Sequence, residues 1–132
     1  MYQPRYPSFS LSPRTFSDSA PRGEALRSLA ETDSLRGRFF SWRGASGRRY
    51  VCSVFQSGEE SFIADVTNGA VIGVAREGVT TRPVCVFLAQ DRKPGDRYAL
   101  RRMARELGVA EWHVHFCADA ATLRDLSASL LN

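Results

Sequence analysis

Apolar and polar positions divide the chain into a first part without periodicity and a second part with clear strand and helix patterns. Residues 1 to about 20 are rich in Pro, Ser, Arg and isolated aromatic residues, which predicts an extended or disordered arm. Residues 21–31 begin with a proline that suits a first helical turn, and Leu26 and Leu29 share a helical face. We therefore expect residues 1–36 to be an irregular N-terminal arm that contains a short helix.

Strand patterns follow in the next part of the chain. The β-rich runs 39–43 and 48–55 flank the tetrapeptide Gly44-Ala45-Ser46-Gly47, which predicts a hairpin. The runs GAVIGVARE and RPVCVFLAQ predict two further strands with a tight connection around Gly78. Both runs are almost continuously apolar, which predicts burial on both faces of the sheet.

Helical spacing appears after the loop DRKPGD. Residues 97–107 predict a helix that ends at Gly108 and buries one stripe, made of Leu100, Met103, Ala104 and Leu107. A strand, EWHVHFCA, and a last helix over 120–131 complete the chain; this helix would bury Leu123, Leu126, Leu130 and Leu131. The fold class is therefore α+β, with a small mixed or antiparallel sheet flanked by helices in the order β-β-β-β-α-β-α over residues 37–132.

Length and composition narrow the class of protein. The chain has 132 residues, 43% of them hydrophobic, which suits one globular domain. It lacks a run of about 18 apolar residues and an N-terminal apolar segment, so we expect neither a membrane span nor a secretory signal. The three cysteines, Cys52, Cys85 and Cys117, stand in apolar runs without a CxxC motif. We interpret them as reduced core residues of a cytoplasmic protein.

Basic residues suggest a partner. The net charge is +4, and all 18 basic residues except Lys93 are arginine. Two blocks, 36–49 and 92–105, hold many arginines and few acids, which is typical of a surface that contacts the DNA or RNA backbone. The candidate nucleic-acid-binding residues are Arg48, Arg49, Arg92, Lys93, Arg97, Arg101 and Arg105. The alternative is that Arg97, Arg101 and Arg105 form only the solvated face of a helix, and the sequence indicates no aromatic stacking platform beside them.

The strand EWHVHFCA contains the only two histidines of the chain, His113 and His115. Because side chains alternate along a strand, these histidines and Cys117 share one face, and together they could offer three ligands to zinc. No fourth ligand is evident, so we expect no metal and no cofactor here. The opposite face, Trp112, Val114 and Phe116, should be buried, and the histidine face should be more exposed.

The region from Phe39 to Asn132 resembles divergent GIY-YIG nuclease-like domains, in particular short bacterial single-domain members. The resemblance rests on the leading hairpin FSWRGASGRRY, the two strands NGAVIGVARE and RPVCVFLAQD, the helix and strand ARELGVAEWHVHF, and the final helix ATLRDLSASLLN. It implies that NGAVIGVARE and RPVCVFLAQD pair with each other before a helix that bears an arginine.

The same resemblance implies that catalysis has been lost. Active members use two motif tyrosines, an arginine and a metal-binding glutamate. Here the first tyrosine position falls on Val71, the second on Cys85, and the glutamate position at or beside Leu123, with Asp125 aimed elsewhere. Only the arginine has candidates, Arg92 or Arg97. No P-loop, nucleophile elbow or spaced carboxylate pair suggests another enzyme.

Two functions therefore remain open from the sequence. The first is a non-catalytic binding module on a degenerate GIY-YIG-like scaffold, which contacts nucleic-acid backbone through its arginines. The alternative is a protein–protein adaptor or an accessory subunit anchored by the N-terminal arm. Its partner-binding residues would be Tyr2, Tyr6, Phe9, Phe16, Leu26 and Leu29. The arm could equally be only a mobile tail.

Overall fold

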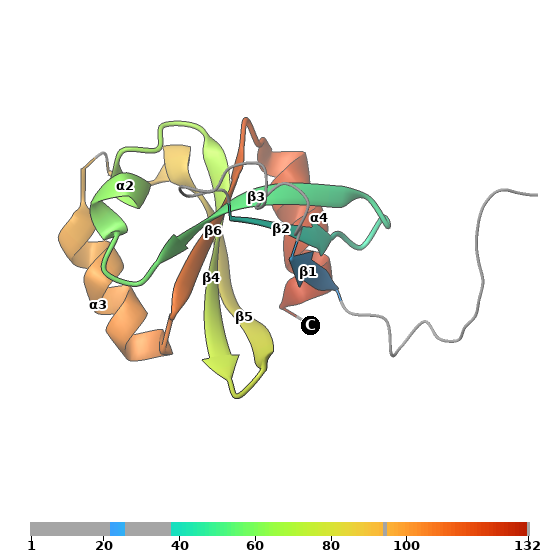
Figure 1. The fold of residues 1–132 in the computed structure, drawn as a ribbon. Helices are drawn as coiled ribbons and strands as arrows, with labels where there is room; N and C mark the ends of the chain where they lie inside the picture. The colour runs from blue at the N-terminus through green and yellow to red at the C-terminus, as the bar shows by residue number, and fades with distance from the viewer. Residues whose placement is uncertain (1–21, 26–37, 94, 132) are drawn as a thin grey trace, which may run out of the picture.

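Six strands form one antiparallel sheet, and helices cover both of its faces (Figure 1). The computed structural model describes residues 22–25, 38–93 and 95–131. The strands are β1 (Gly23–Ala25), β2 (Phe39–Arg43), β3 (Arg49–Gln56), β4 (Gly69–Glu77), β5 (Thr80–Leu88) and β6 (Glu111–Phe116). The helices are α2 (Glu60–Ala64), the short 3-10 helix η2 (Ala89–Asp91), α3 (Arg97–Leu107) and α4 (Ala120–Leu130). The α+β class is confirmed, and the sheet is the antiparallel one of the two expected kinds.

The last strand of the chain lies in the interior of the sheet. The strand order is β1-β2-β3-β6-β4-β5, so β6 bonds to β3 on one side and to β4 on the other. Strand β4 is buried from Gly69 to Ala75, as its continuous apolar run predicts. Strand β5 is an edge strand, and most of its residues are only half-buried. The prediction of burial on both faces is therefore confirmed for β4 and wrong for β5.

The sheet separates two apolar cores. On one face α4 packs over residues from β2, β3 and β4, and this core contains Phe40, Cys52, Ile72, Leu126 and Leu130. On the other face α2 and α3 pack over β4 and β6, and this core contains Ile63, Val71, Leu100, Trp112 and Val114. Figure 1 shows α4 on one side of the sheet and the α2–α3 pair on the other. Alternation along β4 assigns Val71 to one core and Ile72 to the other.

The predicted hairpin and the helix α3 are both present. Strands β2 and β3 pair from Phe39↔Ser53 to Arg43↔Arg49, around the turn that contains Gly44 and Gly47. Helix α3 begins after Asp96, whose carboxylate accepts a hydrogen bond from the Ala99 N–H at 3.0 Å. It ends at Gly108, which adopts a left-handed backbone with φ 73°. None of the described helices is long and apolar enough to cross a membrane.

Two short elements differ from the sequence prediction. Residues 23–25, expected within a helix, form β1, in which Gly23 pairs with Trp42. A Cβ at Gly23 would lie 2.1 Å from the Phe40 ring, so close pairing here requires glycine. Helix α2 was not predicted, because five residues are too few for a helical pattern to be recognised. The element order among the described residues is consequently β-β-β-α-β-β-α-β-α, apart from η2.

Several residues at element ends are more exposed than their patterns predict. Leu107 ends α3 and Leu131 follows α4, and their exposed fractions are 42% and 47%. Leu100 and Ala104 in α3, and Leu126 and Leu130 in α4, are buried as expected. The helical periodicity of both segments was predicted correctly, but the apolar core ends before the last apolar residue of each helix pattern.

Candidate nucleic-acid interface

The candidate nucleic-acid-binding residues lie in two separate groups. Arg48 and Arg49 stand on the β2–β3 hairpin, whereas the other five belong to α3 and to the loop between η2 and α3. Figure 1 places the hairpin tip and α3 at opposite ends of the molecule. The two basic blocks therefore do not form one continuous surface in this structure. We call the second group the α3 basic surface; it consists of Arg92, Lys93, Arg97, Arg101 and Arg105.

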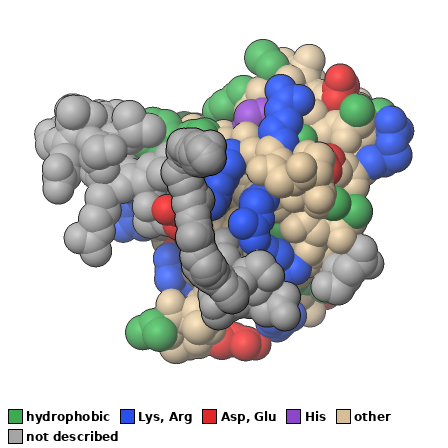
Figure 2. Space-filling model, turned by 90° about the vertical axis from the view of Figure 1, so that its right-hand side faces the viewer, with side chains coloured by type: hydrophobic (Ala, Val, Ile, Leu, Met, Phe, Trp, Pro, Cys, Tyr) green, Lys and Arg blue, Asp and Glu red, His purple; other side chains and the backbone are tan. Residues whose placement is uncertain are grey.

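The hairpin that carries Arg48 and Arg49 is held to α4 mainly by one acid, Asp125. The Asp125 carboxylate accepts hydrogen bonds from the Ser46 N–H at 2.8 Å and from the Tyr50 hydroxyl at 2.7 Å. Arg49 pairs with Glu24 of β1 at 3.0 Å, and Arg48 lies 5.7 Å from the centre of the Tyr50 ring. Figure 2 looks onto this end of the molecule, where blue Lys and Arg side chains gather. Local contacts account for both arginines here.

The α3 basic surface follows the exposed side of a helix. Arg97, Arg101 and Arg105 are spaced by four residues, so they form a stripe about 12 Å long. Leu100 and Ala104 lie on the adjoining side of α3 and are buried in the core. Among the described residues, Arg105 and Lys93 have no ion-pair partner. These side chains remain available for an external anion.

Tyr98 is an aromatic residue that lies among these charges and was missed in the sequence. Its exposed fraction is 64%, and the guanidinium carbons of Arg97 and Arg101 lie 5.2 and 5.8 Å from its ring centre. Hydrogen bonding and the positive charge of Arg97 hold the pKa of Tyr98 below its usual range. The sequence did contain a signal for this exposed ring: Tyr98 is the second residue of the predicted helix and lies outside the apolar stripe that contains Leu100 and Ala104. An exposed aromatic ring therefore lies beside the arginines, where the sequence indicated none.

Arg101 differs from its neighbours because a buried acid faces it. Glu60 of α2 is 1% exposed, and its carboxylate accepts a hydrogen bond from the Trp112 Nε1–H at 2.9 Å. Burial raises the pKa of Glu60, but hydrogen bonds from Trp112 and the Gly58 backbone outweigh it, so the pKa is lowered overall. The Arg101 Nε lies 3.9 Å from this carboxylate. Arg101 therefore has a structural role that Arg97 and Arg105 do not share.

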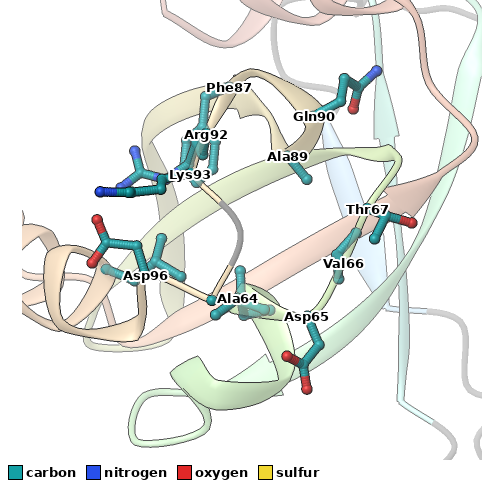
Figure 3. Close-up of a pocket in the computed structure, with 13 residues that line it drawn as sticks. Ala64, Asp65, Val66, Thr67, Phe87, Ala89, Gln90, Arg92, Lys93 and Asp96 are labelled. Atoms are coloured by element: carbon teal, nitrogen blue, oxygen red, sulfur yellow. The ribbon is translucent and has the colours of Figure 1, made fainter.

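A cavity of about 310 Å³ opens beside the start of α3 (Figure 3). Its apolar lining includes Ile63, Ala89 and Leu100, and Arg92 and Lys93 extend from its rim to the same side. The Arg92 guanidinium lies 4.9 Å from the centre of the Phe87 ring, which also lines the cavity. The site thus combines an apolar floor with a charged rim, which carries the cations Arg92 and Lys93 and the acids Asp65 and Asp96.

Aromatic side chains are exposed on another surface, between β3 and α2. Phe62 is 56% exposed and stacks on Phe55 with ring centres 6.1 Å apart. Both residues line a groove that Arg38 and Phe39 also border. Phe116, expected in the core, is 48% exposed because it lies at the end of β6, beside the same two phenylalanines. We call Phe55, Phe62 and Phe116 the aromatic patch.

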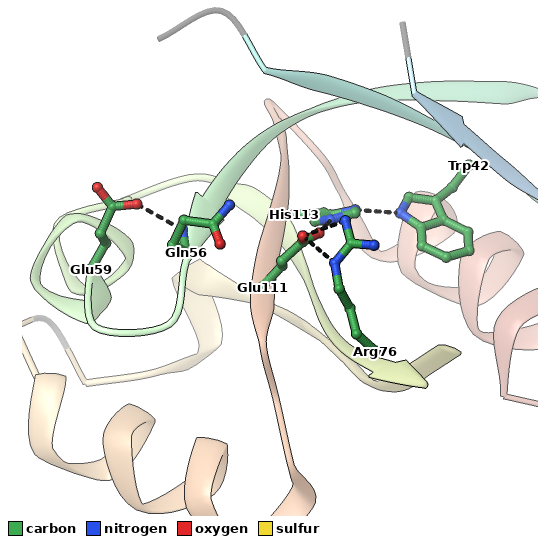
Figure 4. A network of polar contacts seen from close by, with 6 residues as sticks. All are labelled: Trp42, Gln56, Glu59, Arg76, Glu111 and His113. Carbon is green, nitrogen blue, oxygen red and sulfur yellow. Dashed lines mark hydrogen bonds and ion pairs between the residues drawn. The ribbon is translucent and has the colours of Figure 1, made fainter. Parts of the chain in front are cut away.

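His113, the first histidine of the His-Val-His strand, belongs to a buried chain of hydrogen bonds (Figure 4). His113 is 0% exposed, which corrects the expectation of an exposed histidine face, because the rings of Phe40 and Trp42 pack against it with centres 4.8 and 5.8 Å away. Its Nδ1 accepts from the Trp42 Nε1–H at 2.9 Å, and its Nε2 lies 2.9 Å from Glu111 Oε1. Since the indole N–H can only donate, His113 carries its proton on Nε2. Arg76 Nε completes the chain, 2.7 Å from Glu111 Oε2.

The charges of this chain are fixed by its surroundings. Burial lowers the pKa of His113, which keeps the imidazole neutral despite the neighbouring carboxylate. The hydrogen bond with His113, together with Arg76, lowers the pKa of Glu111 to about 2 against the effect of burial. Both nitrogens of His113 are already in use, so its ring offers no free atom to a ligand. Trp112 and Val114, on the other face of β6, are fully buried as expected.

The other two residues of the His-x-His-x-Cys motif have different surroundings. The Nδ1 of His115 lies 2.9 Å from the carbonyl oxygen of Val51, and its ring packs edge-on against Tyr50. Cys117 is exposed and has a left-handed backbone with φ 62°, so its interpretation as a core residue is wrong. Cys52 is buried and Cys85 is half-buried, and the described part of the chain contains no cluster of three metal-ligand side chains.

The remaining candidates lie outside the described residues. These are the partner-binding residues of the arm, Tyr2, Tyr6, Phe9, Phe16, Leu26 and Leu29. Comparisons with protein-family models, with curated proteins and with solved structures found no match to this chain.

Proposed function

We propose that this protein is a non-catalytic, cytoplasmic module that binds the backbone of nucleic acid through the α3 basic surface. The observation that carries the proposal is the set of five basic side chains around one helix; within the part of the chain that the structure describes, only Arg101 of these five approaches a carboxylate within ion-pair distance. Such an arrangement attracts phosphates by charge and releases their counterions on binding. Backbone contacts of this kind position a nucleic acid without reading its sequence.

The arrangement of β4, β5 and α3 supports a degenerate GIY-YIG-like scaffold. The two strands that carry the motif positions pair directly, and a helix with arginines follows them, as the resemblance implies. The catalytic positions, however, are packed in apolar cores. Val71 and Cys85 pack on the α3 side of the sheet, whereas Leu123 packs on the α4 side. These three positions do not converge on one site, which supports the loss of catalysis.

Lack of cleavage is tested by incubating supercoiled plasmid with the purified protein and magnesium or manganese. We expect no nicking, because no hydroxyl or carboxylate stands at the three positions named above. Metal-dependent cleavage that disappears in Arg97→Ala would contradict the proposal.

Binding is tested with fluorescent DNA and RNA oligonucleotides at low salt. Arg97→Ala/Arg105→Ala should weaken binding, whereas Arg48→Ala/Arg49→Ala, which removes the same charge from the opposite end, should leave it nearly unchanged. We avoid Arg101 because its removal also leaves Glu60 without its cation. Equal losses in both double variants would assign binding to net charge alone and reject the α3 basic surface.

The aromatic patch favours a second candidate function, a protein–protein adaptor. Phe62 and Phe116 are about half exposed, and exposed aromatic clusters are typical of protein interfaces. The test is co-purification from the native host of full-length protein, of Phe62→Ser and of a variant lacking residues 1–21, which leaves β1 intact. An unchanged set of recovered proteins in both variants would reject the adaptor function.

A further inference from the structure

The exposure of Tyr98 has no explanation in the packing of the fold. Its ring belongs to neither apolar core, and its described contacts are with the guanidinium groups of Arg97 and Arg101. A tyrosine on a helix surface contributes little to stability when 64% of it is in water. The ring therefore presents an aromatic surface, flanked by cations, at the part of the molecule that carries the proposed function.

This combination suits nucleic acid with unpaired bases. Proteins that bind single strands pair a basic track for the backbone with aromatic side chains on which bases stack. In a duplex, by contrast, each base is already stacked between its neighbours and its faces are not accessible. Arginines that lie against the tyrosine can also stack on a base while they contact its phosphate.

The cavity beside α3 supports the same conclusion independently. It lies next to the first turn of α3 and is lined by Leu100 and by Asp96, the residue before Arg97. Its volume of about 310 Å³ is within the range of small-ligand sites. The cavity offers a planar ring an apolar floor, and its rim offers the phosphate of that ring two cations, Arg92 and Lys93, beside the acids Asp65 and Asp96 (Figure 3). A paired base cannot reach such a concave site without leaving the duplex.

We propose that the α3 basic surface binds single-stranded nucleic acid in preference to duplex, with Tyr98 as a base-stacking residue. The inference rests on the proposed function, since it names the partner of the same surface. Phosphates lie along Arg97, Arg101 and Arg105, and an unpaired base stacks on the Tyr98 ring. The cavity receives a neighbouring base, with Arg92 and Lys93 on its phosphate.

The experiment compares a fluorescent 20-nucleotide oligo(dT) with a 20-base-pair DNA duplex at low salt, for wild type, Tyr98→Phe and Tyr98→Ala. We expect wild type to bind oligo(dT) more tightly than the duplex. Tyr98→Ala should weaken oligo(dT) binding about 5- to 150-fold, the range for one stacked base, and leave duplex binding unchanged. Tyr98→Phe keeps the ring and should retain most of the affinity. Tyr98 faces solvent, so these variants should fold normally, which circular dichroism and thermal unfolding verify.

The outcomes separate the two proposals. If neither oligonucleotide binds at low salt, the proposed function is wrong. If both bind equally well, or if Tyr98→Ala leaves oligo(dT) binding unchanged, the surface binds backbone alone and the single-strand inference is wrong. A matched control is Arg124→Ala, which removes one exposed charge from α4, on the other face of the sheet. A loss in Arg124→Ala as large as in Tyr98→Ala would also contradict the stacking role.

Discussion

Replacing His113 with leucine tests the buried chain of β6. Leucine fills a similar volume but can neither accept from the Trp42 indole nor donate to Glu111. Each buried polar group left without a partner costs about 1–3 kcal/mol. Because Glu111 keeps its ion pair with Arg76, its loss should lie at the low end of that range. We therefore expect His113→Leu to lower the free energy of unfolding by roughly 2–4 kcal/mol, a large part of the total for a domain of this size.

The assay is equilibrium unfolding in urea, followed by tryptophan fluorescence and circular dichroism. His115→Leu is the matched control, because the same substitution two residues along β6 breaks one hydrogen bond at a half-buried site. That variant should lose only about 0.5–1.5 kcal/mol. Equal losses in the two variants, or a loss below about 0.5 kcal/mol in His113→Leu, would refute the reasoning, since ordinary surface sites show such small effects.

Three further predictions concern acid, packing and thiol reactivity. The folded-state pKa values of His113 and Glu111 lie below their ordinary values of 6.5 and 4.5, so the unfolded chain binds more protons than the folded protein. The free energy of unfolding should therefore fall as the pH drops below about 6.5, and fall further from pH 4.5 towards 2. Urea unfolding at each pH measures it. Gly73→Ala should cost about 1–3 kcal/mol, because the added Cβ would lie 2.6 Å from a neighbouring sulfur atom, and thermal unfolding measures it. The thiol of Cys117 should react with a disulfide reagent at once, whereas Cys52, with a pKa raised to about 12 by burial, should react only after unfolding.

Local patterns predicted the elements whose signal is complete within a short stretch. The glycine-bounded hairpin, the apolar run of β4 and the capped helix α3 could all be read directly from neighbouring residues. Helix α2 could not, since its five residues are held by distant partners, such as the bond between Glu60 and Trp112. Strand β1 likewise depends on its pairing with β2, which cannot be predicted from residues 23–25 alone.

The candidate site was only partly predictable for the same reason. The four-residue spacing of Arg97, Arg101 and Arg105 is a local property, and the structure does place them on one helix surface. The position of β6 between β3 and β4 is a property of topology, and it decides that His113 is buried. Topology also separates the hairpin arginines from α3. A sequence pattern records which residues share a face, but it does not record what covers that face.

The salt dependence of oligo(dT) binding tests the central claim most directly. Each phosphate contact to a single strand contributes about 0.7 to the negative slope of log K against log salt concentration, so up to five basic contacts predict a slope near −3.5. Arg97→Ala/Arg105→Ala should make the slope shallower by about 1.4, and Arg48→Ala/Arg49→Ala should leave it unchanged. A slope that does not differ between wild type and Arg97→Ala/Arg105→Ala, or binding that is insensitive to salt, would contradict the assignment of nucleic-acid binding to the α3 basic surface.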